Sequence, residues 1–187
     1  MALSRRDFLK IMGGTTAAIA FPGVILQGCK RALERAAERT PVIWLQAQSC
    51  SGCSVSLLNT VDPDIATVVT QHISLNFHQT VMGATGHVAI KVIEEAVKKH
   101  RKGYVLVVEG SIPTKHDNYC TLGIVDGHHV GIKKWVLDLA DGAAAILSVG
   151  SCAAFGGIPA AQIRATGDNP TGAKSVADII SDTRKLV

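Results

Sequence analysis

The sequence predicts an α/β domain in which helices flank a parallel, doubly wound sheet. The chain has 187 residues, of which 47% are hydrophobic and 18% are charged, so it can bury a core and is too apolar for wholesale disorder. Short apolar runs alternate with segments of helical periodicity along most of its length. Strands separated by helices need right-handed crossovers, and such crossovers place the strands parallel in one sheet.

Four segments have the pattern of strands. Residues 42–45 form a short apolar run that suits a strand buried on both faces, and residues 73–77 alternate between apolar and polar side chains. Residues 104–108 are the strongest strand in the chain, and residues 143–149 predict a fourth.

Four further segments predict helices. A short helix follows a glycine turn at residues 54–58. A longer one ends in a basic last turn before Gly103, and its apolar stripe consists of Val88, Val92, Ile93, Ala96 and Val97. Residues 130–140 predict a helix with Ile132, Trp135, Val136 and Leu139 inward, and residues 174–186 predict a last helix.

The first 28 residues read as a targeting signal. Residues 4–10 match the twin-arginine pattern around Arg5 and Arg6, and the apolar run 11–26 is too short and too interrupted by Pro22 for a confident membrane span. The alternative is an amphipathic start with two chance arginines. The twin-arginine route exports folded proteins with their cofactors inserted, so we expect a cofactor assembled in the cytoplasm and a protein in the periplasm or on the outer face of the cytoplasmic membrane.

Residues 26–29 (LQGC) resemble a lipoprotein cleavage site, although Gln27 is unusual in such a site. Membrane association would then come from a lipid on Cys29 or from a retained signal, and the alternative is cleavage elsewhere. Residues 29–40 are charged and predict a spacer, which leaves residues 41–187 as the folded domain.

Charge and aromatic content argue against a nucleic-acid partner. The formal net charge is +4, and residues 1–28 carry half of it, so the remainder is close to neutral. Aromatic residues make up only 4% of the chain, whereas single-stranded nucleic-acid binders rely on stacking rings.

Four cysteines follow predicted strands. Cys50 and Cys53 come after the first strand, Cys120 lies in the loop after the third, and Cys152 directly follows the fourth. Because parallel sheets bind ligands at the carboxyl ends of their strands, we expect these thiols to converge on one rim. A CxxC pair alone would suit zinc, a redox disulfide or a cluster, but a redox pair leaves Cys120 and Cys152 unexplained.

Two metal groups suit four thiolates, namely zinc and an iron–sulfur cluster. Structural zinc is usually bound by two close pairs of ligands in a small domain that lacks a core of its own. This chain, in contrast, has enough apolar residues for a core. Glycine leaves space for a bulky cluster and lets backbone N–H groups approach the sulfurs. The cysteine loops contain Gly52, Gly123, Gly150, Gly156 and Gly157, and a [4Fe–4S] cluster is therefore favoured over zinc.

Several motifs resemble the small subunit of nickel–iron hydrogenases. They lie at residues 41–59, 109–114, 119–120, 150–161 and 169–173. Within the first, the run Ser-Val-Ser-Leu-Leu-Asn after Cys53 is similar to the nickel–iron–selenium branch.

This resemblance implies a flavodoxin-like domain and a role for each cysteine. Cys50, Cys53, Cys120 and Cys152 would bind the proximal [4Fe–4S] cluster, and the nickel–iron centre would lie on a separate large subunit. Electrons from H2 oxidation would pass through the cluster toward a cytochrome or another acceptor. The segments around residues 50–54 and 150–159 are apolar and poor in charge, which predicts a large interface with that subunit.

The resemblance gives two further residues alternative roles. Ser51 would stand beside the cluster and help to pass protons, or its hydroxyl would cap the following turn. Glu109 would bind backbone N–H groups near the cluster, or be a buried and satisfied carboxylate. The pair His128–His129 is expected in a solvated turn rather than in a metal site.

The small subunits of that family continue into a second region with a His/Cys set and further cysteines. This sequence has no cysteine after Cys152, so we expect one cluster and either a fragment or a short form. Two other functions remain open. One is the related cluster subunit of respiratory complex I, which is not exported and has adjacent cysteines where this chain has Cys50 and Cys53. The other is a lipid-anchored structural or zinc protein.

Overall fold

A computed structural model of the chain describes residues 39–162 and 167–180. The chain divides into two units, Met1–Arg39 and Thr40–Val187, and the fold below is that of the second. The twin-arginine motif, Cys29 and nearly all of the predicted spacer lie outside the described residues.

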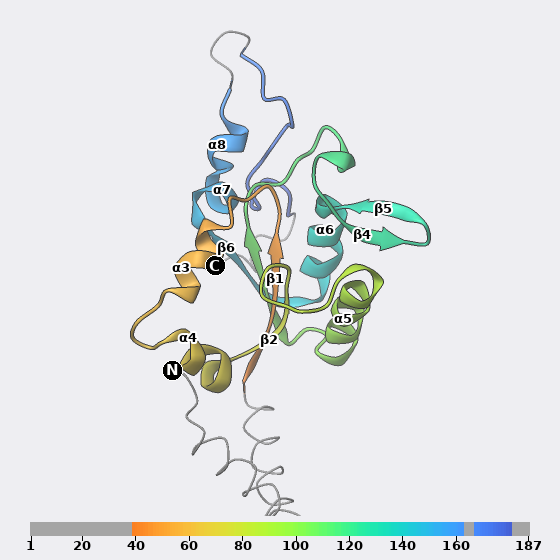
Figure 1. Cartoon of the computed structure of the whole chain (residues 1–187). Coiled ribbons are helices and arrows are strands. Elements are labelled where there is room, and N and C mark those ends of the chain that lie inside the picture. Colours follow the sequence, from red (N-terminus) through yellow and green to blue (C-terminus); the bar gives the residue numbers. More distant parts are fainter. Residues whose placement is uncertain (1–38, 163–166, 181–187) are drawn as a thin grey trace, which may run out of the picture. The chain divides into compact units, whose positions relative to one another are not determined.

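Four parallel strands form the central sheet: β1 (Thr40–Gln46), β2 (Ile73–His78), β3 (Tyr104–Glu109) and β6 (Ala143–Val149). Their order is β2-β1-β3-β6, and every neighbouring pair is parallel (Figure 1). All four predicted strands are confirmed. The chain order reverses between β1 and β3, and open α/β sheets generally bind their ligands at the carboxyl ends of the strands beside such a point.

Helices flank both faces of this sheet, which confirms the doubly wound architecture. The larger core lies between one face and the helices α5 (Gly86–Lys99) and α6 (Ile132–Gly142). On the other face a smaller core forms around Trp44 and contacts Leu57 of α3 (Gly52–Leu58). Figure 1 shows α3 and the paired α5 and α6 on opposite sides of the strands.

Short helical turns complete the connections. They are α4 (Ile65–Thr67), the π-helix η1 (Val68–His72), the 3-10 helix η2 (Asp117–Tyr119), α7 (Gly150–Phe155) and α8 (Gly157–Ala160).

The buried stripe of α5 differs slightly from the prediction. Val88 is 48% exposed, whereas its neighbours Ala89 and Ile90 are buried together with Ile93 and Ala96. The inward face is thus rotated by about one residue at the start of the helix, because residues i, i+3, i+4 and i+7 share a face. In α6 the four side chains predicted to be inward are all buried.

An antiparallel hairpin precedes α6 and was not predicted. It joins β4 (Thr121–Val125) to β5 (His128–Gly131), so residues 130 and 131 are strand, and α6 begins only at Ile132. Its turn is formed by Asp126 and Gly127, both with positive φ, as a two-residue hairpin loop requires. His128 and His129 lie exposed in β5 rather than in a turn.

The predicted last helix is wrong for its described part. Lys174 exchanges both backbone hydrogen bonds with Ile112, which holds it as a β-bridge. Asp178 then accepts hydrogen bonds from the backbone and the hydroxyl of Ser175, so only a single turn forms. Residues 181–187 lie outside the described part of the chain.

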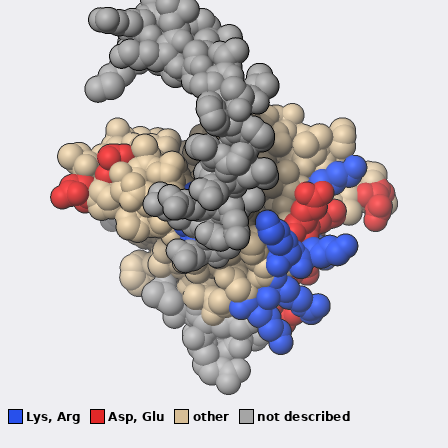
Figure 2. All heavy atoms as spheres, turned by 90° about the horizontal axis from the view of Figure 1, so that it is seen from below, with Lys and Arg blue, Asp and Glu red and all other residues tan. Residues whose placement is uncertain are grey.

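Charged side chains gather at the amino end of the sheet. Viewed from below, Lys and Arg side chains group on one side with acidic residues among them (Figure 2). The end of α5 and the loop that follows contribute the exposed residues Lys98, Lys99, Arg101 and Lys102.

None of the helices in the described residues is long and apolar enough to cross a membrane.

Candidate functional site

The four cysteines of the folded unit follow the carboxyl ends of the strands. Cys50 and Cys53 lie between β1 and the first turn of α3, and Cys152 lies in α7, directly after β6. Cys120 follows η2, and its carbonyl accepts a hydrogen bond from Ile132, the first residue of α6. All four are free thiols.

Three of these thiols lie close enough to influence one another. Burial raises the pKa of Cys53, and its electrostatic interactions with Glu109, Cys50 and Cys152 raise it further. The Cys53 thiol also donates to the carbonyl of Val149, at 3.7 Å between Sγ and O. CxxC and Cys152 therefore meet at the carboxyl ends of β1 and β6.

Cys120 stands somewhat apart. Burial alone raises the pKa of its thiol, and its side chain packs against the larger core. Among the described residues, no interaction joins this thiol to the other three. The structure thus brings Cys50, Cys53 and Cys152 together and places Cys120 at the same end of the sheet, at the start of α6.

Glycines keep the space beside three of the sulfurs free. A Cβ atom on Gly52 would lie 3.1 Å from the Sγ of Cys50, and one on Gly150 would lie 2.4 Å from the Sγ of Cys53. A Cβ on Gly157 would lie 2.6 Å from the Sγ of Cys152. Real Cβ atoms essentially never come within 3.0 Å of another heavy atom, so a side chain at Gly150 or Gly157 would force the neighbouring sulfur to move, and one at Gly52 would make a tight contact. Thiolates with open space around them fit an iron–sulfur cluster, which Cys ligands hold.

Glu109 ends β3 and is the hub of a buried hydrogen-bond network. It is 1% exposed. Oε1 accepts the backbone N–H of Cys53 at 3.2 Å and the hydroxyl of Ser49 at 2.8 Å. Both predicted roles are therefore present, since this carboxylate is buried, satisfied and bonded to a backbone amide of the cysteine loop.

The other oxygen of Glu109 faces the core. Oε2 accepts from Trp44 at 3.1 Å, from Gln46 at 3.3 Å and from the hydroxyl of Ser54. Burial by itself would raise the pKa of Glu109, but the side-chain donors, led by Ser54, hold it below its usual value. The group is therefore a stable carboxylate at neutral pH.

Ser51 adopts a left-handed backbone conformation, with φ 62°. Its backbone N–H donates to the hydroxyl of Ser49 at 2.8 Å, and its carbonyl accepts from Val55. Its own hydroxyl makes no capping hydrogen bond at the start of α3, so the capping role is wrong. Non-glycine residues rarely take this conformation, and here it turns the chain between two cysteines.

Sequence reasoning missed the partners of Glu109. Trp44, Gln46, Ser54 and His78 all contact it directly or through one another, yet they are spread over β1, α3 and β2. His78 pairs with Trp44 beyond an irregularity in the register of β1 and β2, so the alternation of residues along the strand gave no signal for this contact. Ring planes of Trp44 and His78 stack with centroids 5.2 Å apart.

Large apolar side chains stand exposed beside every cysteine. They are Val55 (53% exposed) near Cys53, Tyr119 (47%) beside Cys120, and Phe155 (83%) and Ile158 (88%) after Cys152. Residues 50–58 and 143–161 contain no Asp, Glu, Lys or Arg. The surface around Cys50, Cys53 and Cys152 is therefore apolar and uncharged, as predicted, whereas the loop before Cys120 carries Lys115 and Asp117.

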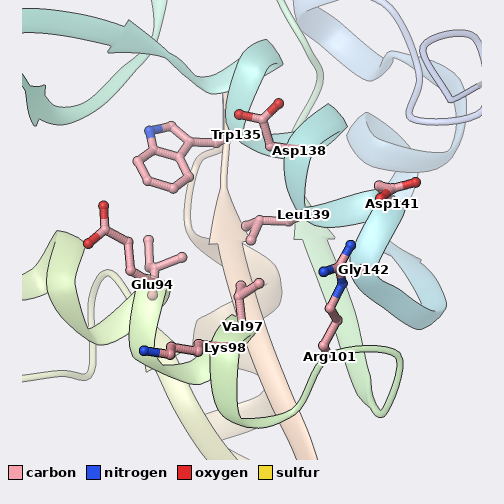
Figure 3. Close-up of a pocket in the computed structure, with 10 residues that line it drawn as sticks. Glu94, Val97, Lys98, Arg101, Trp135, Asp138, Leu139, Asp141 and Gly142 are labelled. Atoms are coloured by element: carbon pink, nitrogen blue, oxygen red, sulfur yellow. The ribbon is translucent and has the colours of Figure 1, made fainter.

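A groove between two helices lies away from these thiols. It occupies about 520 Å³ between α5 and α6, and Figure 3 shows Trp135 and Leu139 in it beside charged side chains such as Glu94, Lys98 and Asp138. No cysteine lines it. His129 lines a second groove with His87, but no three His, Cys, Asp or Glu side chains in residues 39–162 and 167–180 are grouped to hold a single metal ion.

The chain matches known proteins over most of its length. Residues 50–182 match the family described as the NADH ubiquinone oxidoreductase 20 kDa subunit, and residues 2–22 match the twin-arginine translocation signal. The match to the family includes all four cysteines of the site.

Individual relatives are hydrogenase small subunits. The chain is 41% identical to the periplasmic [NiFeSe] hydrogenase small subunit of Desulfomicrobium baculatum, covering 98% of this chain and 59% of that one. It is 39% identical to the quinone-reactive Ni/Fe-hydrogenase small chain of Wolinella succinogenes, covering 95% and 48% respectively. The chain thus spans about half the length of these relatives.

A solved structure shares the fold. The reduced, active Ni-Fe-Se hydrogenase from Desulfomicrobium baculatum superposes with a TM-score of 0.73 at 44% identity, covering 80% of this chain and 55% of that one.

Proposed function

Since the chain belongs to the family of the NADH ubiquinone oxidoreductase 20 kDa subunit, we propose that it works as the electron-transfer small subunit of an exported nickel–iron hydrogenase. The observation that carries this proposal is the glycine-lined group of thiols at the carboxyl ends of β1 and β6. A position between strand ends suits a buried redox group, because backbone donors and a shielded environment set its potential.

Three observations favour a hydrogenase over a complex I subunit within this family. The spacing Cys50-Ser51-Gly52-Cys53 differs from the adjacent cysteines expected of the complex I subunit, and the relatives compared above are hydrogenase small subunits. The chain also carries a twin-arginine signal, which directs it out of the cytoplasm. Whether Cys29 carries a lipid is a separate question, which labelling with a fatty acid would answer.

In this function Cys50, Cys53, Cys120 and Cys152 hold one [4Fe–4S] cluster, which supplies one-electron transfer when bound. The chain's own residues prepare its surroundings. Gly52, Gly150 and Gly157 leave room beside the sulfurs. The carboxylate of Glu109 fixes the loop between the first two cysteines through the N–H of Cys53.

The apolar rim around the thiols supports a large partner subunit. Exposed side chains such as Phe155 and Ile158 are costly to leave in water, and an uncharged apolar surface fits an obligate interface. The nickel–iron centre would lie on that large subunit, facing the cluster. A cytochrome or another acceptor would then receive the electrons.

Substitution of each cysteine tests the ligand set. Replacing Cys50, Cys53, Cys120 or Cys152 by Ser should remove the four-iron signal from low-temperature EPR spectra and lower iron and sulfide content, because each would supply one ligand. Cys29→Ser is the matched control and should leave both unchanged. Zinc without sulfide in the wild-type protein would contradict the proposal and favour a structural metal protein. A normal four-iron signal in one variant would remove that cysteine from the set.

A further inference from the structure

His78 is buried on the sheet face that carries Trp44, at the end of β2. It is 2% exposed, and its ring stacks on the indole of Trp44 with an interplanar angle of 29°. Nδ1 accepts the backbone N–H of Thr80 at 3.2 Å, and Nε2 lies 3.1 Å from the hydroxyl oxygen of Ser54. Both ring nitrogens thus have a partner.

The direction of the hydrogen bond between His78 and Ser54 follows from the number of protons available. The Ser54 hydroxyl carries one proton and donates it to Glu109, whose carboxylate can only accept. Ser54 therefore accepts from its other neighbours, which are Gln46 Nε2 at 2.9 Å and His78 Nε2. His78 is consequently the donor, and it is a neutral imidazole with its proton on Nε2.

This assignment agrees with the surroundings of the ring. Burial lowers the pKa of His78, and the negative charge of Glu109 only partly opposes that effect. A second proton on the imidazole would also have to go to Nδ1, which already accepts from Thr80. The partners of both ring nitrogens, Ser54 at Nε2 and Thr80 at Nδ1, therefore fit the neutral form.

The network reaches the cysteine loop through the two oxygens of one carboxylate. Glu109 Oε2 faces Ser54 and the core, whereas Oε1 accepts from Cys53 N–H and from Ser49 Oγ. Ser49 Oγ in turn accepts the N–H of Ser51. His78, 24 residues from Ser54 in sequence, thus stands two hydrogen bonds away from the carboxylate that orients the loop.

We propose that His78 is a positioning residue for the cluster, acting through Ser54 and Glu109 on the loop that carries Cys50 and Cys53. The inference rests on the proposed function, because it takes this loop to hold the cluster. Cluster potentials depend on hydrogen bonds and nearby charge, and Glu109 places a full negative charge next to the loop. Donation by His78 makes the Ser54 hydroxyl a stronger donor, which compensates part of that charge.

The test measures the reduction potential of the cluster by EPR-monitored redox titration of the chain in complex with its large subunit. Removing the donor in His78→Leu should shift the potential to a more negative value, since less of the Glu109 charge is compensated and reduction adds an electron. His78→Gln keeps an N–H donor and should restore most of the wild-type value. His72→Leu makes the same chemical change at an exposed histidine just before β2 and should cause no shift.

A second set of variants tests the route. Ser54→Ala should cause a shift of the same sign, and the double variant with His78→Leu should shift no further than Ser54→Ala alone, because the histidine acts through the hydroxyl. Additive shifts would overturn the proposed route. Equal potentials in His78→Leu and His72→Leu, with full iron content in both, would overturn the inference itself.

The outcomes separate this inference from the function on which it rests. A wild-type complex without a four-iron signal would refute the cluster assignment, whatever His78 does. If His78→Leu fails to bind iron, Ser54→Ala and His78→Gln still report the potential. A wild-type potential in Ser54→Ala would then overturn the inference.

Discussion

Gly150 stands directly against the thiol of Cys53, although 97 positions separate the two residues in sequence. A Cβ on Gly150 would lie 2.4 Å from that Sγ, and the glycine has φ 80°. This contact between the first residue of α7 and the CxxC loop limits how closely the segment of Cys152 can approach the segment of Cys50 and Cys53.

Gly150→Ala should reduce the iron content of the purified protein strongly, because the added methyl group takes the space of the Cys53 sulfur. Gly127→Ala is the matched control, since Gly127 has φ 79° and nothing within 4 Å of its Cβ position. Both variants should lose roughly 1–2 kcal/mol of stability from the left-handed backbone. Only the first should lose iron. Equal iron content in the two would show that the contact does not matter for the cluster.

Acidification should destabilise the chain through His78. Its pKa in the folded state is depressed, chiefly by burial, so the unfolded chain binds the proton more readily. The neutral ring contributes its full stability at pH values above about 6.5, which is the pKa of a histidine in the unfolded chain. This contribution is lost as the pH falls from about 6.5 toward the lower pKa of His78 in the folded chain. Denaturant unfolding at several pH values should show this slope, and His78→Gln should lack it. An identical pH dependence in both proteins would contradict the assignment of a neutral imidazole.

Ile158→Ser should weaken binding to the large subunit by about tenfold or more, since a buried aliphatic contact of ~1.4 kcal/mol corresponds to a factor of ten in affinity. Val61→Ser provides the control, because Val61 is equally exposed, at 88%, but lies in the loop after α3. Affinities from titration of one subunit with the other would check this. Equal weakening by both substitutions would place the interface elsewhere.

Tyr104→Phe should destabilise the sheet by about 1 kcal/mol, which is typical of one lost hydrogen bond. Tyr104 is fully buried at the start of β3, and its hydroxyl donates to the carbonyl of Leu139 in α6. Burial, with a contribution from Asp141, raises the pKa of Tyr104 to about 12. Tyr119→Phe, at a residue that is 47% exposed, should change the free energy of unfolding little. Similar changes in the free energy of unfolding for Tyr104→Phe and Tyr119→Phe would argue that the buried hydrogen bond of Tyr104 does not contribute to stability.

Local sequence patterns were sufficient for the strands and for the ends at which the thiols lie. Short apolar runs such as residues 104–108 have no alternative to burial, and the crossover rule then orders them in a parallel sheet. The hairpin at residues 121–131 was missed because its strands are short, glycine-containing and half exposed, although the Asp126–Gly127 turn was a readable signal. The helix over residues 174–180 fails because a β-bridge to Ile112 outweighs its helical periodicity.

The hydrogen-bond network could not be predicted in the same way. Glu109 is a carboxylate near the cysteines in sequence reasoning, but its donors in β1, in the loop that follows and in α3 lie more than 50 residues away along the chain. An irregularity in the register of β1 and β2 sets the face on which His78 lies, and only the packed fold gives it Ser54 as a partner. Such contacts depend on tertiary register rather than on spacing along the chain.

The parallel sheet also determines the order in which the protein can mature. Cys53 and Cys152 meet only after β6 has paired with β3, and β6 is the last strand of the sheet to be synthesised. In the proposed function, cofactor loading would therefore follow completion of the sheet instead of guiding it, unlike metal-driven folding of small zinc domains. A chain stalled before β6 docks would lack the proposed loading site, so acquisition of the cofactor would mark a finished fold. For a protein that leaves the cytoplasm already folded, that timing would provide a check on folding before export.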